Sequence, residues 1–459
     1  MPSKPLDPSQ AAAERPRATL FTASVFATIA AVIGYAPGFF VPIAIARFLG
    51  ADARTDAFFL ALSVATLVAG AVGATTQQAA IPFLMEAKRE HRDIGAYIAE
   101  MSTALLLLAV VPTLILSGGV VLYLARERGW PAGQIGVLTE LLWLLVPYIA
   151  FSVLSGIYAG TLNAEHRYNR VAISPALRSG FVLMLVVLLS GMGVVGLAAG
   201  YILGELARLT FLVVMVAKRQ RVRLLAWPRT EGIGEFFRTA VSQMLGSGVV
   251  AFLPLLDRIM ASGLGAGSVS VLDYADKLWQ VPVGFALSGI MVTSLGHWSE
   301  RFQQGGTISM LARDTSRMAI GLFAAVVPFC LIFVVIRASI IPVVFAAAKL
   351  SPREVGLVTD TLAAMVCGIP SYIAALIYTR AFLVLKRSDL LLLIGLIELA
   401  IKPLLNALLI PRFGTVGIGF ATALTYSLAT VLLLAIFHGW LARTSNSHGR
   451  DLAEEMAGR

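Results

Sequence analysis

The chain has 459 residues, of which 58% are hydrophobic and only 14% are charged, and its mean hydropathy is +0.83. This composition excludes an ordinary soluble domain, and repeated apolar runs of about 20 residues indicate helices that cross a bilayer. The net charge of +10 does not indicate a nucleic-acid-binding protein, because the basic residues gather in the loops between apolar runs. The sequence therefore predicts an all-α polytopic membrane protein.

We expect about twelve transmembrane helices, arranged as two six-helix lobes around a central cavity. The expected spans are 20–49, 56–85, 97–125, 136–162, 172–190, 195–217, 235–263, 271–298, 315–347, 358–385, 389–410 and 415–441. The N-terminal lobe then covers 20–217 and the C-terminal lobe 235–441, joined by a basic cytoplasmic linker at 218–234. Polar tails at 1–19 and 442–459 complete the chain.

The basic residues are distributed unequally between the two sets of alternating loops. If the N-terminus lies in the cytoplasm, the cytoplasmic loops hold most of the Lys and Arg residues, above all the linker. The opposite loops hold few, such as Arg54, Lys349 and Arg412. Because cytoplasmic loops are enriched in Lys and Arg, this bias predicts a multi-pass protein with both termini in the cytoplasm.

Charged residues cluster where the first two spans meet, in the segment that contains Arg47 and Asp56. A polar external loop and a functional site are equally good interpretations of this segment. In the sixth span, Glu205 and Arg208 are three residues apart, so we expect them to pair with each other.

Two sequence patterns recur in the second half at nearly the same interval. Residues 158–167 (YAGTLNAEHR) resemble residues 378–387 (YTRAFLVLKR), and residues 193–196 (GVVG) resemble residues 414–417 (GTVG). An even number of helices per half implies parallel repeats about an axis along the membrane normal. This arrangement is typical of transporters in which one lobe moves against the other.

Several charges interrupt the apolar sequence around the expected eighth span: Asp257, Arg258, Asp273, Asp276 and Lys277. Charge at membrane depth is costly, so these residues are candidates for a functional site. On a helix, Asp273 and Asp276 share one face, and Lys277 follows Asp273 by four residues. An Asp–Lys pair that merely neutralises itself between packed helices is the structural alternative.

In the last spans, Arg380 lies within an apolar run without a local acidic partner. An anionic ligand would satisfy its guanidinium group, which suits phosphate oxygens, and a distant partner such as Asp276 is an equally good interpretation. Glu398 and Lys402 are four residues apart, and we expect them to pair with each other.

The sequence has no recognisable enzyme motif. It contains neither a phosphate-binding glycine loop nor a nucleophile motif, and its histidines lack metal-ligand spacing. We therefore expect no cofactor and no metal. Energy for transport would come from an ion gradient or from the membrane potential.

These residues resemble the lipid II flippases of the MurJ or MviN family, within the multidrug/oligosaccharidyl-lipid/polysaccharide exporter superfamily. The best match is ASGLGAGSVSVLDYADKLWQVPVG, in which Asp276 and Lys277 occupy the family's Asp-Arg positions. ARFLGADARTDAFF, LNAEHRYNRVAISPALRS and YTRAFLVLKRSD also match. The family's first helix carries an Arg-Asp pair, and here the corresponding positions hold Val41 and Pro42.

The resemblance implies a bacterial inner-membrane flippase that alternates between inward and outward states. Its substrate would be an undecaprenyl-diphosphate-linked precursor of peptidoglycan, and its partners would be membrane lipids and cell-envelope synthesis enzymes. Three alternatives stay open: a flippase of exopolysaccharide or O-antigen repeat units, a cation-coupled drug exporter, and an inactive scaffold-like member. The drug exporter would bind its cation at Asp273 and Asp276.

Overall fold

The computed structural model describes residues 37–126, 130–165, 167–230, 232–284, 308–385 and 387–457, and within these ranges it contains helices but no strand. Eight of its helices are long and apolar enough to cross a membrane, or up to ten if each bent helix pair is one span. The prediction of an all-α membrane fold is confirmed. The expected number of twelve spans stays a prediction, because parts of the first and eighth expected spans lie outside the described residues.

A first group of helices comes from the N-terminal half. It contains the helix Pro37–Phe48, α3 (Ala53–Arg89), α4 (Ile94–Arg126), α5 (Ala132–Leu144), α6 (Val146–Ala164), α7 (Tyr168–Leu188), the short 3₁₀ helix η1 (Ser190–Met192) and α8 (Gly193–Ala217). A second group follows the linker. It contains α9 (Ile233–Ala251), α10 (Leu253–Ala261), η2 (Ser262–Leu264), a helix over residues 268–284, α12 (Ile308–Val344), α13 (Pro352–Val366), α14 (Ile369–Val384), α15 (Ser388–Phe413) and α16 (Thr415–Ala457).

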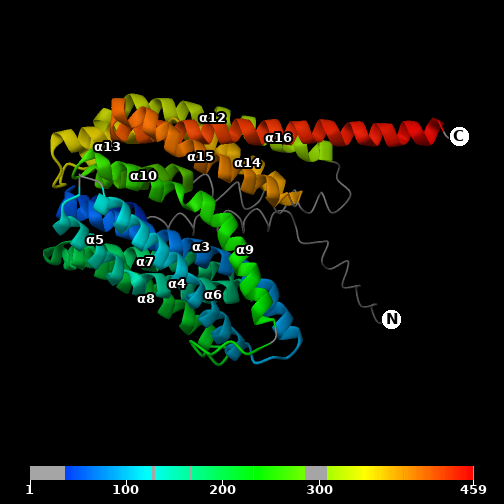
Figure 1. Cartoon of the computed structure of the whole chain (residues 1–459), viewed down its shortest axis with the longest axis horizontal. Helices are drawn as coiled ribbons and strands as arrows, with labels where there is room; N and C mark the ends of the chain where they lie inside the picture. Colours follow the sequence, from blue (N-terminus) through cyan, green and yellow to red (C-terminus); the bar gives the residue numbers. More distant parts are fainter. Residues whose placement is uncertain are drawn as a thin grey trace, which may run out of the picture.

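The two groups lie one above the other and come together at the end where α5, α10 and α13 lie, and they diverge toward the opposite end (Figure 1). Helix α9 runs between them and contacts α3 and α4 of the first group as well as α15 of the second. The boundaries that we expect for the two lobes stay a prediction.

Small residues allow helices within each group to approach closely. A Cβ atom on Gly156 of α6 would lie 2.7 Å from the carbonyl oxygen of Gly73 on α3. In the second group, a Cβ atom on Gly368, just before α14, would lie 2.7 Å from the Cα atom of Ala423 on α16. Such contacts pack backbone against backbone, which is how helices associate where lipid removes the usual hydrophobic driving force.

The two repeated sequence patterns have matching backbone conformations. Arg167, between α6 and α7, has φ −98° and ψ 47°, and Arg387, between α14 and α15, has φ −102° and ψ 57°. Gly193 has φ 61° and ψ −140°, and Gly414 has φ 58° and ψ −133°. The internal repeat inferred from the sequence is therefore a repeat of structure as well.

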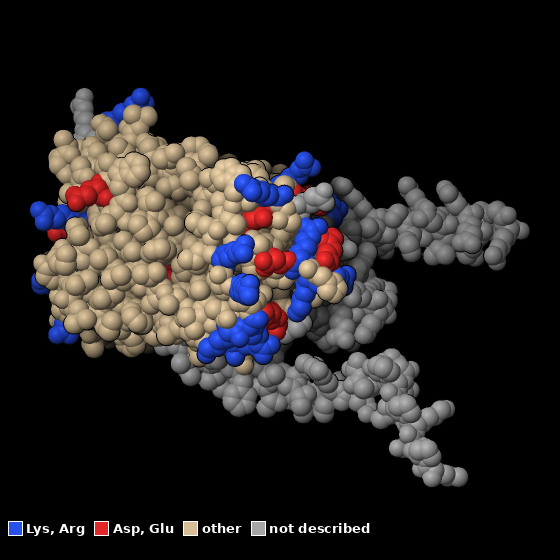
Figure 2. Space-filling model, turned by 90° about the horizontal axis from the view of Figure 1, so that it is seen from below, with Lys and Arg blue, Asp and Glu red and all other residues tan. Residues whose placement is uncertain are grey.

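The surface has the character of a membrane protein. Large apolar side chains are exposed along the helices, for example Phe329 at 73%, Val335 at 78% and Val343 at 73% in α12. Figure 2 shows a broad region of uncharged residues, with a dense group of Lys and Arg toward one end of the molecule. A wide apolar region with charge at its ends is what a lipid bilayer requires.

The linker is attached to the first group through a buried carboxylate. Glu100 of α4 is 7% exposed, and it accepts hydrogen bonds from the backbone N–H groups of Arg229 (2.9 Å) and Thr230 (2.8 Å). The hydroxyl of Thr230 donates a third bond of 2.8 Å to the same side chain. These contacts hold the end of the linker directly before α9 begins.

Candidate functional site

Helix α3 begins with a capping box that fixes the position of Asp56. The side chain of Asp52 accepts hydrogen bonds from the backbone N–H groups of Arg54 (2.9 Å) and Thr55 (2.8 Å), and the Thr55 hydroxyl accepts a bond of 2.7 Å from the Asp52 N–H. Such caps satisfy the free N–H groups of a helix start. One residue later, Asp56 follows at a well-defined place in the first turn.

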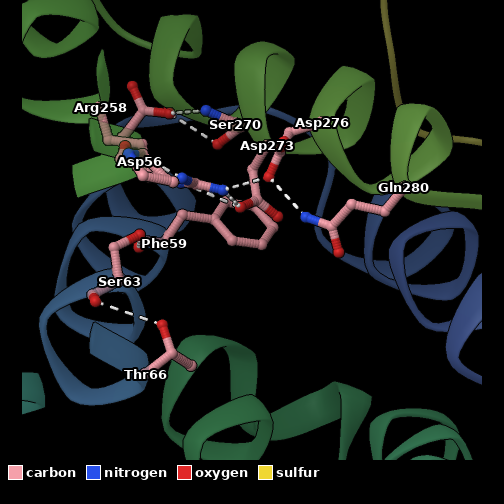
Figure 3. Close-up of polar contacts among 10 residues, drawn as sticks. Asp56, Phe59, Ser63, Thr66, Arg258, Ser270, Asp273, Asp276 and Gln280 are labelled. Atoms are coloured by element: carbon pink, nitrogen blue, oxygen red, sulfur yellow. Dashed lines mark hydrogen bonds and ion pairs between the residues drawn. The ribbon is translucent and has the colours of Figure 1, made fainter. Parts of the chain in front are cut away.

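Asp56 connects the two groups of helices. Its carboxylate is only 1% exposed and accepts three hydrogen bonds: from the N–H of Gly267 (2.7 Å), the N–H of Ser270 (2.8 Å) and the hydroxyl of Ser270 (2.6 Å). Both N–H groups lie at the start of the helix 268–284, where free N–H groups and the helix dipole favour a negative charge. Figure 3 shows Asp56 and Ser270 bonded across the two groups.

Three further hydrogen bonds join the groups at the same end of the molecule. The Tyr274 hydroxyl donates to the carbonyl oxygen of Gly50 (2.5 Å), the Trp130 ring N–H donates to that of Ser262 (3.0 Å), and the Lys349 N–H donates to that of Ala46 (2.9 Å). Together with the Asp56 bonds these contacts form what we call the seam. The polar-loop interpretation of Asp56 is therefore wrong, because its side chain is buried between the two groups.

Gly267 is required for the closeness of the seam. It has φ +88°, and a Cβ atom at this position would lie 2.8 Å from the carbonyl oxygen of Ala51 in the first group. Any other residue would strain the backbone at this φ, and its Cβ atom would collide with the carbonyl oxygen of Ala51. The seam therefore depends on a glycine as well as on its hydrogen bonds.

Next to the seam lies a polar group that we call the arginine cluster: Arg258 and Asp273, which are buried, with Asp276, which is partly buried, and the exposed Gln280. The guanidinium group of Arg258 donates to Asp273 Oδ1 from Nε (3.1 Å) and Nη2 (2.5 Å), and from Nη2 to Asp276 Oδ2 (2.9 Å). Gln280 Nε2 donates to the same Asp276 oxygen at 3.0 Å, as Figure 3 shows. The structure thus brings three of the predicted site residues together.

The structural alternative, in which Asp273 and Lys277 only neutralise each other, is wrong. Asp273 binds Arg258 from the preceding helix, whereas Lys277 lies on the same helix as Asp273 and makes no ion pair within the described part of the chain. The spacing of Asp273 and Lys277 would allow them to form an ion pair, but Asp273 is paired with Arg258 of α10 instead. Asp276, the distant partner considered for Arg380, is likewise bound to Arg258.

Two predicted basic residues are left without a counter-ion. Lys277, on the helix 268–284, and Arg380, on α14, are both half-buried, and neither has an ion-pair partner among the described residues. Their helices pack together, since the Trp279 ring packs edge-on to Tyr372 of α14. The Trp279 ring N–H also donates to the carbonyl oxygen of Met365 on α13 (3.1 Å). A third predicted residue, Arg47, is exposed and lies over the Phe48 ring, 5.9 Å from its centre. It therefore belongs neither to the seam nor to the arginine cluster.

Asp257 belongs to a different group, the lysine cluster: Asp257, Lys402, Asn406 and Thr422. Lys402 Nζ lies 3.0 Å from Asp257 Oδ2 and donates to Thr422 Oγ1 at 2.6 Å. The expected pairing of Lys402 with Glu398 is therefore wrong, because a carboxylate from α10 takes its place.

In the first group the sequence identified only part of the charged site. Glu205 pairs with Arg208 at 3.1 Å, as predicted, and also with Arg178 of α7 at 3.5 Å. Sequence reasoning missed Arg178, although its position in the middle of an apolar helix was the signal that could have identified it. The side chain of Arg178 is 33% exposed, whereas that of Glu205 is fully buried.

The positions that correspond to the family's Arg-Asp pair are apolar and buried. Val41 is 6% exposed and Pro42 is also buried in the helix Pro37–Phe48. That helix packs against α7, because a Cβ atom on Gly38 would lie 3.4 Å from the hydroxyl oxygen of Ser179. At these two positions the chain therefore has no charge, and the charges of the first group include the buried Glu205 with Arg178 of α7.

In the residues that the structure describes, no group of three or more His, Cys, Asp or Glu side chains could hold a metal ion. The arrangement has a set of fixed hydrogen bonds at one end, the side chains of Lys277 and Arg380 without an ion-pair partner among the described residues, and a partly exposed arginine, Arg178, in the first group. These groups suit recognition of an anion.

Comparison with known proteins gives one family. The family model described as "Lipid II flippase MurJ" matches residues 45–446. The chain is 26% identical over 415 residues to a "Probable lipid II flippase MurJ" of Buchnera aphidicola subsp. Acyrthosiphon pisum (strain APS), covering 87% of this chain and 80% of that protein. It is 25% identical over 441 residues to the "Lipid II flippase MurJ" of Burkholderia cenocepacia, covering 90% and 82% respectively.

Solved structures share the fold. The structure described as "Lipid II flippase MurJ, inward closed conformation" superposes with a TM-score of 0.73 at 17% identity, covering 91% of this chain and 87% of that one. An inward-facing multidrug resistance MATE family transporter of the MOP superfamily superposes with a TM-score of 0.70 at 13% identity, covering 90% and 96%. At these identities the similarity establishes the architecture alone.

Proposed function

The chain belongs to the lipid II flippase MurJ family, and we propose that it carries an undecaprenyl-diphosphate-linked precursor of peptidoglycan across the bacterial inner membrane. The family match over residues 45–446 is the observation on which this proposal depends most. The apolar surface and the basic end of the molecule support an inner-membrane location with both termini in the cytoplasm.

The substrate's diphosphate would be bound by Lys277 and Arg380. Both side chains are half-buried and without a counter-ion in the described part of the chain, and burial of an unpaired charge is costly. A diphosphate supplies negative oxygens that both a lysine and the planar fork of an arginine can bind. Arg258 does not compete for the diphosphate in this arrangement, because Asp273 and Asp276 neutralise it.

The first group would contribute Arg178. Glu205 compensates the charge of one arginine, so its pairing with both Arg178 and Arg208 leaves one net positive charge. Arg178 is the more exposed of the two side chains, at 33% against 15%. In this chain Arg178 therefore takes the part that the family resemblance assigns to a first-helix arginine.

Transport would proceed by alternating access. The seam closes one end of the molecule, while the groups diverge at the other end (Figure 1). By the predicted orientation, the seam lies on the outer side of the membrane, so this is an inward-facing arrangement. Opening the seam while the other end closes would present the headgroup to the opposite side, with the lipid tail remaining in the bilayer.

The experiment that tests this function is rescue of cells depleted of their own lipid II flippase. We expect the unmodified chain to restore growth, and we expect the double variant Lys277→Gln, Arg380→Gln to fail at equal membrane abundance. The matched control, Arg47→Gln, removes a cation that is exposed and outside the clusters, and it should rescue fully. No rescue by the unmodified chain at good abundance would contradict lipid II as the substrate.

The same experiment separates the alternatives. A scaffold-like member should tolerate neutralisation of Lys277 and Arg380. A flippase of exopolysaccharide or O-antigen units would fail to rescue but would restore the corresponding polymer in a strain that lacks its own flippase. The drug-exporter alternative is weakened by the geometry, because Asp273 and Asp276, which would bind the cation, are already bound to Arg258.

A further inference from the structure

An open groove lies where α4, the linker and the start of α9 meet. Its volume is about 340 Å³, which is within the range of sites that bind small ligands. It is at the end of the molecule opposite the seam, since α9 runs from the linker toward α10 at the seam (Figure 1). None of its described lining residues belongs to the seam or to the proposed diphosphate contacts. The groove therefore needs an explanation of its own.

The groove is polar at its rim and apolar along its depth. Arg229 and Thr230 line the rim, at the level where they bind Glu100. Leu107 lies two turns after Glu100 on α4, about 10 Å further along the helix, and Phe237 lines the groove from α9. Exposed apolar side chains continue along α4 beyond Leu107: Val110, Val111 and Leu114. This gradient suits an amphiphile, with its headgroup at the rim and its chain along α4.

The cation at the rim is available to a ligand. The backbone N–H of Arg229 is bound to Glu100, but its side chain is exposed and forms no ion pair within the part of the chain that the structure describes. Glu100 is buried and already accepts three hydrogen bonds from Arg229 and Thr230. Residues 218–230 contain five basic side chains and no acidic one. A phosphate group is the anion that an arginine fork binds best.

The linker beside the groove is firmly attached and yet presents apolar side chains outward. The Ala226 N–H donates to the carbonyl oxygen of Ala99 on α4 (3.2 Å), and Gly95 has no room for a Cβ atom beside the carbonyl oxygen of Arg221. Three large side chains of this held segment are exposed: Leu224 at 52%, Leu225 at 56% and Trp227 at 69%. Tryptophan and apolar residues among basic ones are typical of segments in the headgroup region of a bilayer. The rim of the groove therefore lies against a lipid leaflet.

We propose that the groove binds one anionic phospholipid from the leaflet at the basic end of the molecule. Arg229 binds the phosphate of the headgroup, and one acyl chain lies along Leu107 and Phe237. Trp227 lies beside the headgroup. A soluble anion would gain nothing from the apolar depth of the groove, whereas a phospholipid matches both its charge and its apolar lining. The bound lipid holds the start of α9, the helix that contacts both groups.

The test uses the fluorescence of Trp227 in phosphatidylcholine vesicles that contain brominated lipid, which quenches a nearby tryptophan. The signal of Trp227 is the difference between the unmodified chain and Trp227→Phe, which keeps an aromatic side chain at this exposed position. We expect brominated phosphatidylglycerol to quench Trp227 at a mole fraction about fivefold lower than brominated phosphatidylcholine does, the preference that one arginine gives at an anionic surface.

Two variants locate the lipid in the groove. Arg229→Gln removes the cation and keeps the backbone N–H that binds Glu100, so the two brominated lipids should then quench at nearly equal mole fractions. Gly234→Leu fills the groove without a change of charge, because Gly234 lines it and a Cβ atom there would meet nothing within 4 Å. It should lose the preference as well. The matched controls are Arg412→Gln, an exposed arginine on α15, and Gly119→Leu, an open position further along α4, and both should keep the preference.

Four results would overturn this inference. Equal quenching of the unmodified chain by the two lipids would exclude an anionic site, and no quenching by either would place Trp227 in water. A preference that both Arg229→Gln and Gly234→Leu retain would assign it to the general charge of the linker. Relief of quenching by inorganic phosphate, at an ionic strength matched with chloride, would identify a soluble anion as the ligand. None of these measurements involves flipping of lipid II, so the site stands or fails independently of the proposed function.

Discussion

Asp56 is a single carboxylate that holds two groups of helices together, and its replacement tests the seam directly. In Asp56→Asn one acceptor oxygen becomes a donor, so at least one of the bonds from Gly267 and Ser270 is lost. Loss of a hydrogen bond to a charged group costs about 1.5–3 kcal/mol. We expect the N–H groups of Gly267 and Ser270 to exchange with solvent deuterium roughly tenfold faster or more.

The control for this prediction is Asp52→Ala, which removes the side-chain cap of α3 within the first group. It should speed exchange at Arg54 and Thr55 and leave Gly267 unchanged. If Asp56→Asn left the exchange of Gly267 and Ser270 at its original rate, the seam would not depend on the carboxylate.

The proposed substrate contact of Arg178 can be tested with Arg208 as the matched control. Arg178→Gln and Arg208→Gln each leave Glu205 with one arginine, so their structural costs are similar. Only Arg178→Gln removes the proposed substrate contact, and it should lower the rate of lipid II flipping in proteoliposomes by about tenfold or more. Arg178→Lys should restore part of the rate. If Arg178→Gln and Arg208→Gln lowered the flipping rate equally, the role of Arg178 would be structural.

The sequence identified which residues carry charge into the membrane, but not which charges meet. Asp273, Asp276 and Arg258 could be selected because isolated charges in apolar runs are rare. Their pairing could not be predicted, because helical spacing describes neighbours on one helix and contains nothing about a partner on another. Lys402 shows the same limit: its neighbour in sequence was Glu398, and its partner in space is Asp257.

At the scale of elements, the repeated turn before α8 and α16 is the feature that the sequence specified best. Gly193 and Gly414 adopt a conformation with positive φ that side chains rarely adopt. Gly193→Ala and Gly414→Ala should each lower the free energy of unfolding by about 1–3 kcal/mol. The midpoint of thermal unfolding in detergent measures this change.

Gly191→Ala is the matched control for the turn. It lies two residues before Gly193, without a positive φ, and a Cβ atom there would meet nothing within 4 Å. Its unfolding midpoint should stay close to that of the original chain. A similar loss in all three variants would mean that backbone conformation is not the reason for these glycines.

Helix type was predictable because it depends on local chemistry, and expected spans such as 97–125 agree with α4 (Ile94–Arg126). Proline did not mark the helix ends, since Pro112 lies inside α4. Bends were harder, since α13 and α14 form a pair bent by 42° at Cys367 and Gly368. A span with such a bend has the same composition as a straight one.

At the scale of the whole molecule, composition and the positions of Lys and Arg predicted a membrane protein with one basic end. The contact between its halves could not be foreseen, because Asp56 and Ser270 are separated by 214 residues in the chain. Their contact depends on how the two groups pack. The family match then supplied what composition cannot, the class of substrate.

The stability of the seam also determines what fraction of the molecules has an open seam when no ligand is bound. If closing is favoured by about 3 kcal/mol, the value of one strong hydrogen bond to a carboxylate, roughly one molecule in a hundred is open at a given moment. A ligand that binds only the open form would then bind about a hundredfold more weakly than its contacts alone allow. If the seam faces the outside of the cell, as proposed, an inhibitor acting from that side would bind only this minor open population.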